Sequence, residues 1–167
     1  MNVGYYKTID GERHILESNK IINISNKNII DVLIPDGVEE FHCNDNQLSK
    51  LIIPESISTL YCNKNNISEL IFLGEHINYV DCSDNKLKSL NIPKNINTLI
   101  CNNNKLTTLH LLEGIEILSC INNPINELVV PKSILTILAT NTNIQTVTIP
   151  KITERYYFDK SVEIIQK

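Results

Sequence analysis

The sequence predicts an all-β solenoid, in which the chain winds into short coils that stack side by side. Three observations predict it: cysteines recur every 19 or 20 residues, an asparagine follows each cysteine three residues later, and apolar residues keep the same phase. The cysteines and asparagines are Cys43, Cys62, Cys82, Cys101 and Cys120, and Asn46, Asn65, Asn85, Asn104 and Asn123.

Seven copies of the period cover residues 22–150 when Ile24 and Ala139 take the cysteine position, which is numbered 0 here. Apolar residues fill positions −2, +5, +8 and +10 of every copy, and a proline follows position +10 in five copies. Each copy buries too few apolar residues to close a core alone, so neighbouring coils must cover one another.

Each copy begins with a short strand, because positions −2 and 0 are apolar and alternate with polar neighbours. The rest of the coil is too short for an ordinary helix, and its Ile-Pro steps favour an extended or polyproline backbone. We therefore expect an extended outer side with little or no helix. The one 20-residue copy contains Leu73-Gly74, where the additional residue is expected to bulge.

The two ends of the chain are expected to cover the open ends of the array. Residues 1–21 hold two short apolar runs around Asp10-Gly11, which is a hairpin signal. Residues 151–167 supply Tyr156, Phe158, Val162 and Ile164 for a C-terminal cover. The organisation is thus a single domain with a cover at each end and seven repeats over 22–150.

The segment "LYCNKNNISEL", from Leu60 to Leu70, reads L-x-C-x-x-N-x-I-x-x-L and resembles the conserved segment of leucine-rich repeats. The short period with "IP" in its variable half is similar to repeats of bacterial secreted effectors. The asparagine-, isoleucine- and cysteine-rich variant resembles repeat proteins of giant viruses of amoebae. The resemblance implies a right-handed coil, a parallel sheet on a concave face, and the binding of a partner protein, such as a host protein.

Composition excludes several classes of partner. A net charge of −4 and a pI near 5.5 argue against nucleic acid and anionic membranes, and no apolar run is long enough for a membrane span. No secretory signal is visible, and the odd number of cysteines indicates reduced thiols. We therefore expect a cytoplasmic protein.

The cysteines do not suggest a metal site. Neighbouring strands are about 4.8 Å apart, so Cys43 and Cys120 lie roughly 19 Å apart, too far for one zinc ion to collect the row. Disulfides are disfavoured by parallel side chains in a reducing compartment, and His42 points away from Cys43 on the opposite face of its strand. We interpret the thiols as small buried hydrophobes, and we expect no cofactor, no metal and no enzymatic activity.

The asparagines stand where each strand leaves the sheet. A buried amide needs partners for its donors and its acceptor. We expect backbone groups of the same and adjacent coils to meet them in a continuous ladder that ends at Lys27 and Thr142.

Function is then left to the variable positions −3, −1 and +1, which point outward from the strands. They place two tyrosines and an acidic residue in the middle of the array and four aliphatic residues toward its C-terminal part, a candidate partner-binding surface. These residues are Tyr61, Tyr79, Asp81, Ile100, Ile117, Ile121 and Leu138. The first hypothesis is a non-catalytic protein–protein interaction module, expected to be monomeric; the alternative is a structural protein that assembles end to end, for example in a virion.

Overall fold

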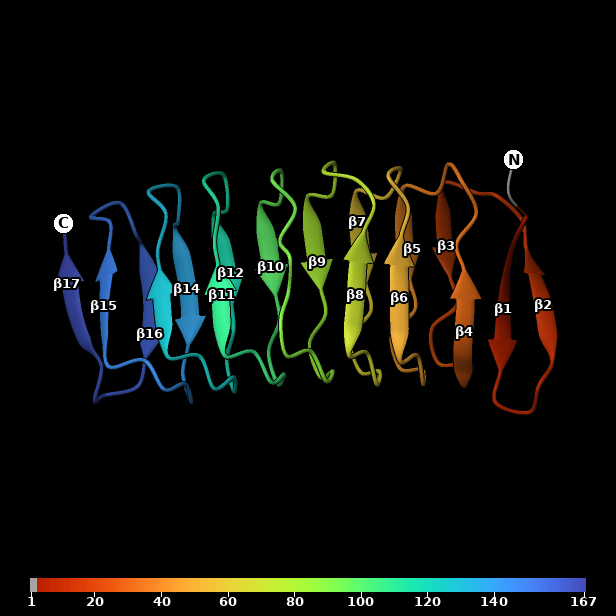
Figure 1. Cartoon of the computed structure of the whole chain (residues 1–167). Helices are drawn as coiled ribbons and strands as arrows, with labels where there is room; N and C mark the ends of the chain where they lie inside the picture. Colours follow the sequence, from red (N-terminus) through yellow and green to blue (C-terminus); the bar gives the residue numbers. More distant parts are fainter. Residues whose placement is uncertain (1–2) are drawn as a thin grey trace.

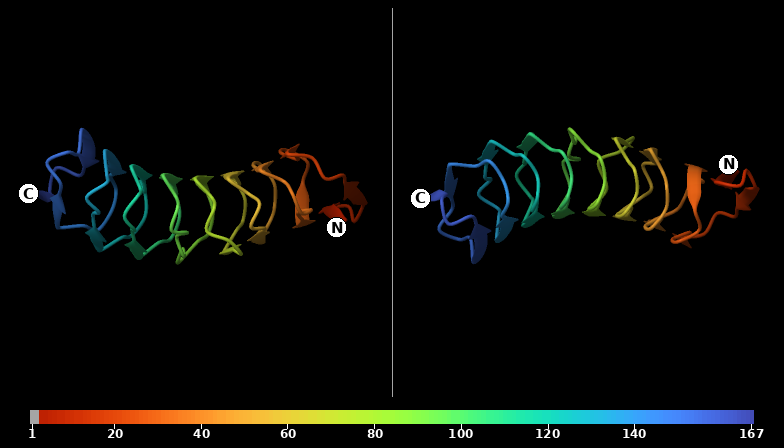
Figure 2. Two further views of the ribbon diagram at one scale, coloured as in Figure 1. Left: turned by 90° about the horizontal axis from the view of Figure 1, so that it is seen from above. Right: turned by 90° about the horizontal axis from the view of Figure 1, so that it is seen from below.

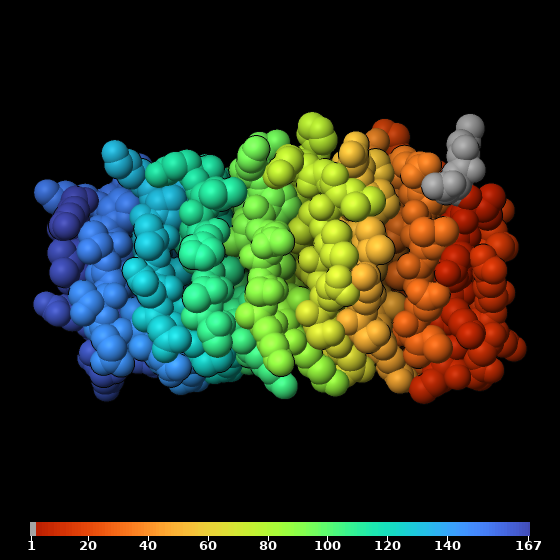
Figure 3. Space-filling view, in the orientation of Figure 1, coloured from red at the N-terminus to blue at the C-terminus, as the bar shows by residue number. Residues whose placement is uncertain are grey.

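The computed structural model describes residues 3–167, and these form a parallel β-solenoid without any helix. The coils follow one another in chain order from the N-terminal to the C-terminal end of an elongated molecule (Figure 1). A space-filling view shows the coils as successive stripes of colour along the long axis (Figure 3). The predicted coil of stacked repeats is confirmed.

One side of the solenoid is a continuous parallel sheet of eight strands, called the main sheet here. Each coil contributes one short strand, and equivalent residues of successive coils lie opposite one another, as Leu99 does to Val80 and Leu118. In spatial order from the N-terminal end the strands are β3 (Ile21–Asn23), β5 (Glu40–His42), β7 (Thr59–Tyr61), β9 (Tyr79–Asp81), β10 (Thr98–Ile100), β12 (Ile117–Ser119), β14 (Thr136–Ala139) and β16 (Arg155–Phe158).

The opposite side is also extended, but more of it is true β-sheet than the Ile-Pro steps predict. Two-stranded parallel sheets pair β6 with β8, β11 with β13, and β15 with β17, and Figure 2 shows the two sides running along opposite edges of the molecule. The strands of this side are β4 (Ile29–Leu33), β6 (Lys50–Ile53), β8 (Glu69–Phe72), β11 (Thr108–His110), β13 (Glu127–Val129), β15 (Thr146–Ile149) and β17 (Glu163–Gln166). The proline falls after the strand, so its missing N–H costs no ladder bond.

The core lies between the two sides and is built from the repeated apolar positions. Every residue at positions −2, 0 and +5 of the seven copies is buried. A further buried position, −5, was not recognised in the sequence; it is filled by Val38, Ile57, Ile77, Ile96, Ile115 and Ile134. It secures the corner at which each coil turns into the main sheet.

The N-terminal residues form an antiparallel hairpin of β1 (Gly4–Thr8) and β2 (Arg13–Leu16). β1 also pairs with β4, so the hairpin extends the opposite side beyond the first coil, and Leu16 and Tyr6 pack on the core.

Residues 151–167 continue the coil and do not fold across it. β16 pairs in parallel with β14 and β17 with β15, which makes an eighth turn. Thr153, Tyr156 and Phe158 stand 19 residues after Ile134, Ile137 and Ala139, and so occupy positions −5, −2 and 0 of this turn.

The additional residue of the 20-residue coil lies at the corner after β8. Leu73 is exposed there, and Gly74 passes so close to the preceding coil that an added Cβ would lie 2.9 Å from the Cα of Glu55. Only glycine fits that approach without a shift of backbone.

Candidate functional site

The five thiols lie inside the solenoid and are free. Each cysteine is 0% exposed. Burial in apolar surroundings raises the pKa of every one, that of Cys120 to about 12, so the thiols stay protonated and unreactive at neutral pH. In the folded chain they fill space in the core.

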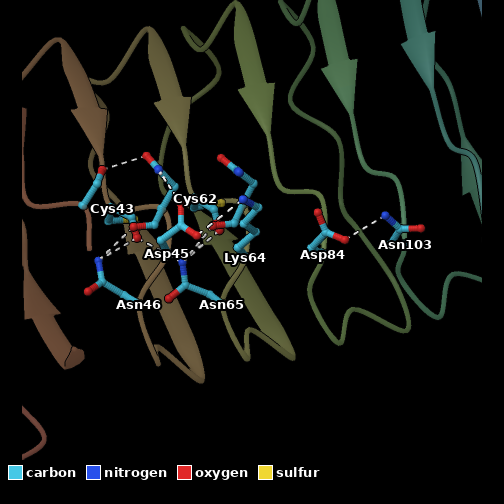
Figure 4. A network of polar contacts seen from close by, with 11 residues as sticks. Cys43, Asp45, Asn46, Cys62, Lys64, Asn65, Asp84 and Asn103 are labelled. Atoms are coloured by element: carbon cyan, nitrogen blue, oxygen red, sulfur yellow. Dashed lines mark hydrogen bonds and ion pairs between the residues drawn. The ribbon is translucent and has the colours of Figure 1, made fainter. Parts of the chain in front are cut away.

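The asparagine ladder joins each coil to the one before it. The Asn85 amide nitrogen donates to the carbonyls of Cys62 (3.0 Å) and Cys82 (3.1 Å), while its oxygen accepts the N–H of Ile67 at 2.8 Å. Asn46, Asn65, Asn104 and Asn123 repeat this pattern. Figure 4 shows the side chains of Asn46 and Asn65 lying side by side below the strands.

At the C-terminal end of the array, the column of asparagines ends at Thr142, and a carboxylate of the eighth turn binds the backbone there. The two oxygens of Asp159, in the eighth turn, accept the backbone N–H groups of Asn141 (3.1 Å) and Thr142 (3.2 Å). The ladder therefore closes on a side chain that the repeat pattern alone does not identify.

A second row of side chains runs along the rim at position +2. The residues there have positive φ in all seven copies, near 55°, and six of the seven are asparagine or aspartate. Asn141 donates to Asn122, Asn122 to Asn103, and Asn103 to Asp84 at 2.7 Å; Figure 4 shows this last bond. The exception is Lys64, whose ammonium lies 3.5 Å from Asp45.

Three rings lie in a row across the outer face of β5, β7 and β9, and we call them the aromatic row. His42 stacks on Tyr61 with ring centroids 4.5 Å apart, and Tyr61 meets Tyr79 at 4.9 Å with planes tilted by 40°. His42 Nε2 is also 2.6 Å from Glu40 Oε1. The sequence predicts the two tyrosines as contact residues, whereas His42 and Glu40 are not among the predicted site residues.

Asp81 lies beside the aromatic row at the end of β9. Its Oδ1 accepts the N–H of Ser83 at 3.0 Å, which fixes the carboxylate against the backbone. Burial, and then the neighbouring Tyr61 and Asp81, raise the pKa of Tyr79 to about 12, so this phenol is neutral throughout the physiological range.

Four aliphatic side chains follow on β10, β12, the turn after β12, and β14, and we call them the aliphatic patch. Their outward positions in the sequence predict that all four are exposed. Ile117 is 40% exposed, while Ile100, Ile121 and Leu138 are half-buried because neighbouring side chains in register shield them. Asn102 stabilises this region, since its Oδ1 accepts the Ile121 N–H at 2.8 Å and the Ser119 hydroxyl at 2.7 Å.

The remaining histidines do not gather near these residues. His14 belongs to β2, where it stacks on Tyr6, His110 belongs to β11 on the opposite side, and His76 lies in an exposed turn. Within residues 3–167, no group of three or more metal-ligating side chains comes together, and no helix long enough to cross a membrane is present.

Comparison with known proteins gives no relative from which a function could be inferred: no family model matches the chain, and no curated protein or solved structure is similar to it.

Proposed function

We propose that this protein is a non-catalytic binding module that holds a partner protein on the outer face of its main sheet. In finer terms, we propose a leucine-rich repeat protein with short coils, whose main sheet is the concave recognition face. The single observation that carries the proposal is the grouping of the aromatic row and the aliphatic patch on consecutive strands of one sheet.

The physical support is the contrast between the repeated and the variable positions. The side chains at the cysteine, asparagine and apolar positions pack in the core or form the ladder. They therefore cannot contact a partner protein. The outer positions hold large side chains with both apolar area and polar tips, of the kind that dominates protein interfaces. A rigid sheet also binds without a large loss of conformational entropy.

The test is affinity capture from an amoebal cell lysate with the wild-type protein and the double variant Ile100→Asp, Ile121→Asp. We expect the wild type to retain a distinct protein and the double variant to lose it, because two carboxylates would interrupt the aliphatic patch. The matched control is Ile52→Asp, Val129→Asp, which changes two exposed aliphatic residues of the opposite side. Capture that survives in the Ile100/Ile121 variant but fails in the control would move the site to the opposite side.

A second candidate function, assembly end to end, is favoured by the C-terminal turn. β16 and β17 are the last strands of their sheets, and Tyr157 of β16 is 61% exposed. An uncovered strand edge can pair with another chain. Light scattering over a range of protein concentrations separates the two candidates: a binding module stays at the mass of one chain, and a self-assembling protein grows with concentration.

A further inference from the structure

Between β3 and β14, the charges on the outer face of the main sheet are of one sign; the cation Arg155 stands at the far end, on β16. From β3 to β14, the outward positions −3, −1 and +1 contain Glu40 and Asp81 but neither lysine nor arginine. Such a surface attracts a cationic partner and repels an acidic one.

Asp81 lies where a cation can meet an aromatic ring as well as a carboxylate. Tyr61 contacts Tyr79 from the side of β7, and the residue opposite Tyr79 on the other side is Thr98 of β10, whose side chain is small and has no ring. Asp81 is two residues after Tyr79 on the same strand, so both side chains rise from the same face.

A third polar group next to Asp81 lacks a partner. The hydroxyl of Ser83 has no hydrogen-bond partner among the described residues, although Ser83 is only 7% exposed. Its N–H binds Asp81 Oδ1, and its outward position +1 places it on the same face of the chain. A buried hydroxyl without a partner costs free energy, which a ligand donor would recover when the Ser83 side chain turns outward to meet it.

We propose that Tyr79, Asp81 and Ser83 form a subsite for a cationic side chain, arginine in preference to lysine, on an extended segment of the partner protein. A guanidinium stacks on a tyrosine face, forms two parallel bonds to a carboxylate, and keeps further N–H donors for a hydroxyl. The chain already contains the stacking half of this arrangement: Arg13 lies over the Tyr5 ring, 3.9 Å from its centroid.

The aliphatic patch fixes the second feature of the ligand. Ile117 lies in register with Thr98 and Tyr79, two strands from the tyrosine, which is roughly 10 Å at ordinary strand spacing. An extended peptide advances about 3.3 Å per residue. A segment that crosses the strands therefore places an aliphatic residue about three positions from its arginine. This inference rests on the proposed function, because it names the chemistry of the partner for the same surface.

The experiment is selection of peptides from a random 12-residue phage-displayed library on the immobilised full-length protein. We expect selected peptides to be enriched in arginine or lysine with a leucine, isoleucine or valine about three positions away. One such peptide, fluorescently labelled, then serves as the probe in polarisation titrations. Its affinity should fall at least tenfold in Asp81→Asn, which keeps the oxygen that binds Ser83 N–H, and severalfold in Tyr79→Leu.

Glu127→Gln is the matched control, since it removes the same charge from an exposed residue of β13 on the opposite side, and its affinity should stay within twofold of the wild type. Peptides without an excess of cations, or unchanged binding in Asp81→Asn, would overturn the cationic subsite. Loss of binding in the Ile100/Ile121 variant but not in Asp81→Asn leaves the proposed function intact and rejects the subsite. Loss of binding in Asp81→Asn but not in the Ile100/Ile121 variant supports the subsite and rejects the aliphatic patch. Failure to select any peptide contradicts both the subsite and the proposed function.

Discussion

At the scale of single residues, the period assigns one physical task to each position. The asparagine at +3 is a hydrogen-bonding group with fixed partners in two coils, and the residue at +2 must adopt a left-handed backbone conformation. Neither task requires reactivity, which explains why residues that resemble chemical motifs in the sequence are structural in the fold.

The asparagine ladder predicts a cost for removing one amide. Asn85→Ala leaves the Ile67 N–H without its acceptor inside the solenoid, and it removes one of the two amide donors to each of the Cys62 and Cys82 carbonyls. The free energy of unfolding should fall by about 1–3 kcal/mol, the usual cost of unsatisfied buried groups. Urea unfolding followed by circular dichroism measures it, with the exposed Asn126→Ala as control; equal stability of the two variants would contradict the role of the ladder.

Position +2 predicts a variant that is more stable than the wild type. Lys64 holds a positive φ of 55° where six equivalent residues are asparagine or aspartate, and its ion pair with Asp45 is exposed and worth little. Lys64→Asn should raise the free energy of unfolding by about 0.5–1 kcal/mol, because asparagine tolerates this conformation better. Lys86→Asn, at a position without positive φ, should bring no gain in the same urea titration.

At the scale of elements, each strand of the main sheet has one face buried in the core and one outward face whose residues vary between coils. Leu60 and Cys62 point into the core, and Tyr61 between them points outward. Substitution on the outer face therefore leaves the core untouched, and substitution on the inner face affects the two adjacent coils as well.

The buried thiols of these strands make stability depend on pH. Burial raises the pKa of Cys120 to about 12, whereas a thiol in an unfolded chain ionises near pH 8.5. Above that pH the unfolded chain holds fewer protons than the folded one, so the stabilisation is complete below about pH 8.5 and is lost as pH rises toward the folded pKa.

The limiting slope is about 1.4 kcal/mol per pH unit for each such thiol. Urea unfolding between pH 8 and 10.5 measures the slope for the wild type. Cys120→Ala isolates the contribution of one thiol, since tyrosines and lysines titrate in both proteins; identical slopes would show that Cys120 is not protected in the folded state.

At the scale of the whole molecule, the solenoid is held together only by contacts between neighbouring coils. Central coils have two neighbours and the eighth turn has one, with most of β16 and β17 exposed. Stability should therefore decrease toward the C-terminal end.

Hydrogen exchange read by mass spectrometry tests this gradient. We expect the slowest exchange in peptides that contain β9 and β10, and the fastest among the parallel strands in β16 and β17. Equal protection of β17 and β9 under the same conditions would mean that the molecule opens only as a whole, or that another chain covers its C-terminal end.

The path of the chain could be predicted because burial imposes a strict period on residues such as Leu60, Cys62 and Ile67. The eighth turn is harder to predict from the sequence because Phe158 replaces the cysteine or alanine found at position 0 of most repeats. Thr153 and Tyr156 nevertheless keep the 19-residue spacing. The contact of His42 with Tyr61 and with Glu40 depends on side-chain rotamers on neighbouring strands, which no pattern along the chain encodes. The pairing of β6 with β8 likewise depends on how closely adjacent coils approach.

The corner at Gly74 has a consequence for the gene. A coil of 20 residues stacks among coils of 19 because the additional residue stays at the corner. The strands of the main sheet and the asparagine ladder therefore remain in register across this coil. Recombination that joins two repeat-coding segments in phase would yield a chain with one coil more or fewer and the same internal bonding. The length of the main sheet can thus change in inherited steps of about 4.8 Å, while each coil keeps the same bonds to its neighbours.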